Sequence, residues 1–224
     1  MTPAAWPCPT PDGGSAEEYA LCCDRGRARR LLIVPALFDE ANRLRRLTVE
    51  VMRRLDGAGI DSILPDLPGC NESLQPLEAQ TPMGWRAAMA AAAAHFGATH
   101  VLGIRGGAML TPGPLPGWHY APSKGASILR QLIRARILAS RETGISESQD
   151  SLLEQGLAKG LELAGFRLGP VLLGEFQGLT PVPGARIVDQ DTIGGGGLWL
   201  RADPGEDRDQ ADALAAVLAI GIAA

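Results

Sequence analysis

Short runs of consecutive apolar residues alternate along the chain with longer segments in which apolar residues recur every three or four positions. The short runs are typical of strands buried on both faces of a parallel sheet, and the longer segments are typical of amphipathic helices. The pattern predicts strands over residues 31–35, 60–64 and 99–104, with helices over residues 40–58 and 82–96 between them. Successive strand–helix–strand units favour right-handed crossovers and a doubly wound, mostly parallel α/β sheet.

The two ends of the chain give weaker signals. Residues 1–16 show no periodicity and are interpreted as a loose arm, followed by an edge strand over residues 18–23. Three further strands and a closing helix are predicted over residues 118–121, 185–188, 198–201 and 209–222.

Residues 125–178 are interpreted as a cap inserted between strands of the sheet. They begin with an amphipathic helix over residues 125–141, continue with a helix to about residue 158 and a short strand over residues 161–168, and end in another helix. We expect the Ile/Leu face of the first helix to pack in the core. The alternative, a basic helix lying on an anionic membrane surface, is not favoured. All 224 residues then form one α/β domain.

The most informative stretch is residues 101–107, which read VLGIRGG. An apolar run ends there in glycines spaced as in the G-x-S-x-G turn, where a strand turns sharply into a helix and presents a nucleophilic serine. The serine position is occupied by Arg105. A guanidinium group stays protonated and cannot attack a carbonyl, so serine-type acyl transfer cannot start from this residue. We expect its backbone to lie in a sparsely allowed region.

The helix that should follow this turn is predicted to be missing or vestigial. Pro112, Pro114 and Pro116 leave room for about one helical turn, because each proline inside a helix costs ~3 kcal/mol. The amides and dipole at the start of that helix normally help to stabilise an oxyanion beside the nucleophile.

Composition narrows the functional classes. A formal net charge of −4 gives no electrostatic reason to expect nucleic-acid binding. The four cysteines lack the paired spacing of a zinc site, and we interpret them as reduced thiols in the cytoplasm. We expect no metal and no cofactor. No signal peptide or bilayer-spanning run is apparent, so the expected location is cytoplasmic, and the oligomeric state is left open.

Several blocks of the sequence resemble α/β-hydrolases. Residues 33–46 and 64–73 match that superfamily, and residues 65–73 are similar to its strand-4 loop. Residues 103–110, with 126–136 and 161–170, narrow the resemblance to the family of exosortase A system-associated hydrolase 2. The resemblance covers most of residues 30–170. It implies the α/β-hydrolase fold and a bacterial setting in exopolysaccharide production and protein sorting, with an enzymatic name but no known reaction.

A catalytic triad is not apparent in the expected order of nucleophile, acid and histidine. The histidines are His95, His100 and His119, and none follows the last predicted strands, although Asp189 stands where the acid could be. We interpret His95 and His100 as surface residues. His119 lies nearer the functional edge and is a weak catalytic candidate, because a lone histidine is usually structural or solvated.

Ser73 and Cys70 are the remaining candidate nucleophiles, in the loop after Asp66. Each would need a base within hydrogen-bond reach, and the sequence supplies none beyond His119. We favour a structural role for both, with Ser73 bonding to the turn backbone and Cys70 packing as a small apolar residue.

Charged and polar residues gather where the predicted parallel strands end, the edge at which open α/β sheets usually bind ligands. These candidate ligand-binding residues are Asp39, Glu40, Asn42, Arg43, Asp66 and Arg105. In one interpretation Arg105 pairs with a carboxylate and closes the former nucleophile site. In the other, Arg105 and Arg43 receive a small anionic ligand such as a carboxylate or phosphate. We favour the ion pair, because it satisfies an arginine without any ligand.

The sequence therefore predicts an α/β-hydrolase-like protein without a working triad, acting as a non-catalytic binding or accessory module. The alternative is a hydrolase of an ester or other acyl substrate that uses an unconventional set of residues.

Overall fold

A computed structural model describes residues 1–203 and 205–224 and is built on a seven-stranded sheet of order β1-β2-β4-β3-β5-β6-β9. The strands are β1 (Thr2–Pro9), β2 (Ser15–Cys23), β3 (Arg30–Val34), β4 (Asp61–Pro65), β5 (His100–Ile104), β6 (Gly117–Tyr120) and β9 (Arg186–Val188). Neighbours from β4 to β9 run parallel, whereas β2 is antiparallel to both β1 and β4. The predicted doubly wound, mostly parallel sheet is confirmed.

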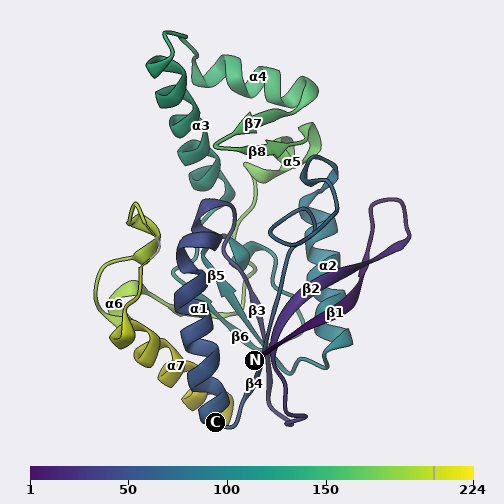
Figure 1. The fold of residues 1–224 in the computed structure, drawn as a ribbon, viewed down its shortest axis with the longest axis vertical. Helices are drawn as coiled ribbons and strands as arrows, with labels where there is room; N and C mark the ends of the chain where they lie inside the picture. The colour runs from purple at the N-terminus through teal and green to yellow at the C-terminus, as the bar shows by residue number, and fades with distance from the viewer. Residues whose placement is uncertain (204) are drawn as a thin grey trace.

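Helices cover both faces of this sheet (Figure 1). The helices α1 (Asp39–Gly57) and α7 (Arg208–Ala223) pack side by side on one face, and α2 (Pro82–His95) covers the other. Successive residues of β3 alternate between the two cores. Leu31 and Ile33 join the α1 side, and Leu32 and Val34 join the α2 side. This is why the central strands read as unbroken apolar runs.

The cap rises above the sheet as a separate group of elements, at the top of Figure 1. It contains α3 (Gly125–Glu142), α4 (Gln149–Lys159), the hairpin of β7 (Leu161–Leu163) and β8 (Phe166–Leu168), and α5 (Pro170–Phe176). The two ends of the cap meet, because the Gly125 amide donates to the Leu179 carbonyl at 3.0 Å. The cap predicted over residues 125–178 is therefore present.

The apolar face of α3 packs into the core, as expected. Its residues Ile128, Leu129, Leu132 and Ile133 are all at most 5% exposed. Among the residues that the structure describes, no helix is both long and apolar enough to cross a membrane.

The interpretation of residues 1–16 as a loose arm is wrong. Residues 2–9 form β1, the edge strand, and pair residue by residue with β2, which therefore lies inside the sheet. Trp6 and Cys8 point inward and are buried. Prolines at positions 3, 7 and 9 hid this alternation, and an edge strand tolerates them because one side of its backbone needs no partner strand.

Two strand predictions in the C-terminal half of the chain are also wrong. Residues 198–201 do not form a strand, because Leu198–Leu200 is a short 3₁₀ helix after α6 (Gln190–Ile193). The single strand expected over residues 161–168 is a hairpin, since Ala164 and Gly165 adopt positive φ values of 50° and 83° and reverse the chain.

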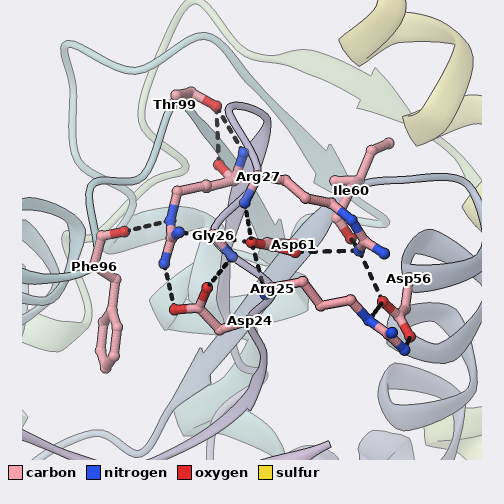
Figure 2. A network of polar contacts seen from close by, with 10 residues as sticks. Asp24, Arg25, Gly26, Arg27, Asp56, Ile60, Asp61, Phe96 and Thr99 are labelled. Atoms are coloured by element: carbon pink, nitrogen blue, oxygen red, sulfur yellow. Dashed lines mark hydrogen bonds and ion pairs between the residues drawn. The ribbon is translucent and has the colours of Figure 1, made fainter.

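A buried carboxylate organises the edge of the sheet at which the parallel strands begin (Figure 2). Asp61, at the start of β4, is fully buried and accepts hydrogen bonds from the backbone amides of Arg25 and Arg27 at 3.0 and 2.8 Å. The Arg27 guanidinium adds a bond of 3.1 Å, and Arg30 lies 3.6 Å away. Hydrogen bonds from Arg25 and Arg27 also lower the pKa of the nearby Asp56 carboxyl to about 2. The network holds the loop between β2 and β3 against the start of β4.

We predict that Asp61→Ala lowers the free energy of unfolding by about 2 to 5 kcal/mol, because the part-buried backbone amides of Arg25 and Arg27 lose their acceptor. Urea denaturation followed by tryptophan fluorescence measures the change. Asp56→Ala, in the exposed part of the same network, serves as the control and should lower the free energy of unfolding by less. Equal losses in the two variants would contradict the assigned role of Asp61.

Candidate active site and its arginine

The turn after β5 has the strained geometry expected at Arg105. Arg105 adopts a φ of 51°, which is unusual for a residue other than glycine. Close packing explains the glycines around it. A Cβ at Gly103 would lie 2.7 Å from the Ala108 Cα, and one at Gly107 would lie 2.3 Å from the Pro35 carbonyl oxygen.

The chain leaves this turn in a 3₁₀ helix, Arg105–Met109, and no α-helix follows before β6. The prediction of a missing or vestigial helix is confirmed. Beside the turn, the side chains of Leu37 and Ile128 occupy the space next to Gly106, within 2.9 Å of where its Cβ would be. The residue that directly follows Arg105 is therefore covered by apolar side chains.

The Arg105 side chain is held on three sides. Its Nε and Nη2 donate to the two carboxylate oxygens of Glu40 at 3.1 and 3.0 Å, and its Nη1 donates to the Ala121 carbonyl at 2.7 Å. The guanidinium carbon lies 4.1 Å from the centroid of the Trp199 ring. The Arg105 and Glu40 side chains are 12% and 10% exposed. This is a bidentate ion pair stacked on an aromatic face, a geometry that suits arginine and not lysine.

Glu40 reaches this position because it lies in the first turn of α1. Phe38, which precedes the helix, has a φ of 55° and turns the chain sharply from β3 into α1. A carboxylate at a helix N-terminus is also favoured by the helix dipole. Arg105 therefore pairs with a carboxylate in the first turn of the helix that follows the neighbouring strand, β3.

Trp199 was missed by the sequence analysis. It lies in the 3₁₀ helix Leu198–Leu200, its carbonyl accepts a 2.9 Å hydrogen bond from the Arg43 guanidinium, and its ring packs edge-on against Tyr120 at 6.0 Å between ring centroids. Arg43 also lies 3.5 Å from Asp39. No periodic pattern marks this tryptophan, and interpreting its segment as a strand placed it in the wrong element.

The structure brings together only part of the predicted ligand-binding set. Asp39, Glu40 and Arg43 lie around Arg105 and Trp199. Asp66 does not pair with Arg105; it accepts hydrogen bonds from Asn71 at 2.9 Å and Arg45 at 3.4 Å. Asn42 is exposed on α1, and its side chain makes no hydrogen bond among the described residues.

The weaker catalytic candidates have other partners. Ser73 donates to Glu18 at 2.7 Å and accepts from the Gly69 amide, so its hydroxyl stabilises a loop. Burial raises the pKa of the Cys70 thiol to about 12, which keeps it protonated and a poor nucleophile.

His119 and Asp189 do not assemble with these groups. His119 is buried and contacts Thr111 at 3.2 Å, and its pKa is lowered by desolvation. Asp189 is exposed at the start of α6. Among the described residues, no serine or cysteine is hydrogen-bonded to a histidine.

A pocket of about 270 Å³ lies beside the ion pair, between the start of α1, the cap helix α3 and the segment that carries Trp199. Phe38, Leu132 and Trp199 give it apolar walls, while Glu40 and Arg43 provide its charged groups. The cap and the sheet edge therefore enclose a small space directly next to Arg105.

Comparison with solved structures relates this architecture to proteins of known fold. DcsB in complex with its substrate analogue is similar, with a TM-score of 0.56 and 11% identity over 100% of both chains. Alpha/beta hydrolase domain-containing protein 10 from mouse gives a TM-score of 0.54 and 14% identity, covering 84% of this chain and 77% of that one. The chain has the α/β-hydrolase fold. Arg105 therefore occupies the nucleophile elbow of this fold.

A putative hydrolase from Agrobacterium vitis has the same α/β-hydrolase fold, with a TM-score of 0.53 and 15% identity over 79% of this chain and 71% of that one. No model of a protein family matches the sequence, and a comparison with curated proteins finds no significant match. In hydrolases of this fold that use a catalytic triad, the histidine is the last of the three residues along the chain. Here the segment after β9 supplies Trp199, which covers Arg105.

We predict that Gly107→Ala lowers the free energy of unfolding by about 1 to 3 kcal/mol, since the new Cβ would overlap backbone oxygens that cannot move freely. Those oxygens belong to Pro35 and Val34, at 2.3 and 2.5 Å. Gly57→Ala is the control, because nothing lies within 4 Å of its Cβ position at the end of α1. A Gly107→Ala protein as stable as the control in urea would show that the elbow is not tightly packed.

A second prediction concerns the ion pair. Arg105→Ala should lower the free energy of unfolding by about 3 to 5 kcal/mol, because Glu40 would remain buried without its partner. Glu40→Ala should lower the free energy of unfolding much less in the Arg105→Ala protein than in the wild-type protein. A double-mutant cycle measures this difference. Arg136 and Glu147 form a bidentate pair at 2.9 and 3.1 Å on the cap and provide the control. Removing Arg136 should cost less, because its side chain is 37% exposed.

Proposed function

We propose that this protein is a non-catalytic α/β-hydrolase-fold protein that acts as a binding or accessory module. The observation that carries the proposal is the fixed position of Arg105, which fills the nucleophile site and is neutralised by Glu40. A guanidinium has no lone pair with which to attack a carbonyl. The side chain that hydrolase chemistry requires is thus replaced by one that stabilises the fold.

The surroundings of the elbow support the same conclusion. An oxyanion in this fold is stabilised in part by the amide of the residue after the nucleophile, which is Gly106 in this chain. Leu37 and Ile128 pack beside Gly106, and no α-helix begins there to contribute its dipole. The site therefore lacks the arrangement that favours a tetrahedral intermediate.

Arg105 is better suited to closing this site than to receiving an anion. Three of its five N–H groups are already bound, and Glu40 compensates its charge in a mostly buried setting. An incoming carboxylate or phosphate would have only two free N–H groups to bind, on a guanidinium whose charge Glu40 already compensates. Arg43, at the edge of the adjacent pocket, is the more accessible cation for a small anionic ligand.

The alternative, a hydrolase of an ester or other acyl substrate, would need residues outside the elbow. Ser73, His119 and Asp189 are its candidates, and each is engaged or exposed in a different part of the fold. The connection to the exosortase system rests on sequence resemblance alone and is part of the proposal.

The experiment that tests this proposal is a direct search for acyl transfer. We expect no fluorophosphonate labelling and no turnover of short p-nitrophenyl esters above a heat-treated control, because no described serine has a histidine base. Arg105→Ser should also stay inactive, since it restores a hydroxyl without restoring a base.

Two outcomes would contradict the proposal. Labelling of the wild-type protein that disappears in Ser73→Ala would favour the unconventional hydrolase. Esterase activity gained by Arg105→Ser would reveal a base near the elbow. Circular dichroism of each variant shows whether it is folded, so that inactivity is not confused with unfolding.

A further inference from the structure

A larger pocket, of about 630 Å³, lies on the α2 side of the sheet and shares no lining residue with the pocket beside Arg105. Its walls are the outer alanines of α2, residues 111–115 after the elbow and residues 180–183 before β9. The volume falls within the range of about 300 to 1,000 Å³ that is typical of small-molecule sites. The proposed function makes no use of this pocket.

The shortened helix after the elbow explains why this space exists. Pro112 and Pro114 direct the chain along the surface instead of into a helix that would cover α2. Two hydrogen bonds fix the walls. The Arg86 Nε donates to the Met109 carbonyl at 2.9 Å, and the Val182 amide donates to the Ala108 carbonyl at 2.9 Å. The pocket is therefore formed before any ligand binds.

The charge of the pocket is positive. Of the described residues that line it, Arg86 alone is charged, and no carboxylate of the described chain lies within 4.0 Å of its guanidinium. Its Nε is used by Met109, which leaves the two terminal nitrogens as donors toward the pocket. A guanidinium held in this way is suited to a carboxylate.

A buried histidine determines whether the hydroxyl of Thr111 can donate a hydrogen bond into the pocket. His119 is 1% exposed; its Nε2 lies 3.2 Å from the Thr111 hydroxyl, and its Nδ1 has no hydrogen-bond partner among the described residues. Burial lowers its pKa, so one ring nitrogen carries the single proton of the neutral imidazole. A buried N–H without an acceptor is rarer and costlier than a bare acceptor nitrogen. This cost favours the tautomer in which Nε2 carries the proton and donates it to the Thr111 hydroxyl oxygen.

This direction leaves the hydroxyl hydrogen of Thr111 without an acceptor in the described structure. Thr111 lines the pocket, so the missing acceptor is one that a ligand would supply. Arg86, an exposed residue of α2, and Thr111, which is 6% exposed, line the pocket together with alanine, proline, leucine and valine residues.

We propose that this pocket binds a small amphiphilic carboxylic acid. Its carboxylate accepts from the Arg86 guanidinium and the Thr111 hydroxyl, and its apolar body packs on the outer face of α2. The proposal is independent of the function assigned to the elbow, because neither Arg105 nor Glu40 takes part.

Titration calorimetry with octanoate and its neutral analogue octanamide tests the proposal. Octanoate should bind the wild-type protein at least about tenfold more tightly than octanamide, because only the carboxylate carries a charge opposite to that of the Arg86 guanidinium. Arg86→Gln should weaken octanoate binding about tenfold, and Thr111→Val should weaken it about fivefold.

Matched controls separate these effects from general damage. Thr180→Val, in the same pocket but without a side-chain hydrogen bond among the described residues, should change affinity by less than about twofold. Ala90→Trp, on the exposed face of α2, should block binding while the protein stays folded by circular dichroism. Long-range proton–nitrogen NMR spectra should show His119 protonated at Nε2.

The proposal would be overturned if octanoate and octanamide bound equally, or if Arg86→Gln and Thr111→Val kept the wild-type affinity. Unchanged octanoate binding by Ala90→Trp would place the site elsewhere. No binding to the folded wild-type protein at ~10 mM octanoate, or a proton on Nδ1 of His119, would also contradict it.

Discussion

The close approach of β3 and the turn after β5 is the constraint on which this architecture depends. Gly107 lets the backbone after Arg105 lie against the Pro35 carbonyl, and the turn holds Arg105 at a positive φ. The same approach brings the guanidinium to Glu40 at the start of α1. Backbone strain of this kind persists only when surrounding contacts hold it in place. In this chain the contacts that hold it are an ion pair and an aromatic ring instead of substrate chemistry.

Arginine in place of serine in the turn after β5 is accompanied by differences in several other parts of the fold. The segment after the turn forms the 3₁₀ helix Arg105–Met109 instead of an α-helix, and Pro112, Pro114 and Pro116 follow it. Trp199 comes from the chain segment after β9, and its ring covers the guanidinium. The structure thus keeps the geometry of a hydrolase while the side chains at its centre favour a closed, charge-neutral core.

Periodicity predicted the central elements because their burial is uniform. β3, β4 and β5 lie in the middle of the sheet, and α1 and α2 pack on its two faces, so the apolar positions of these elements face a core. The edge strand β1 escaped detection because only Trp6 and Cys8 are buried and prolines interrupt the alternation. Around the elbow, the sequence predicted that Arg105 needs a carboxylate but not which one. Trp199 is separated from Arg105 by 94 residues, so only the folded chain shows their contact.

The two ends of the cap lie side by side, where the Gly125 amide bonds to the Leu179 carbonyl. Because the chain enters and leaves the cap at neighbouring positions, the register of the sheet strands does not depend on the length of the excursion. Insertions between closely spaced ends are generally well tolerated by the domain that receives them. The outer part of the cap can therefore vary in length and change the entrance to the small pocket beside Arg105, while the α3 residues that pack in the core keep their place on the sheet.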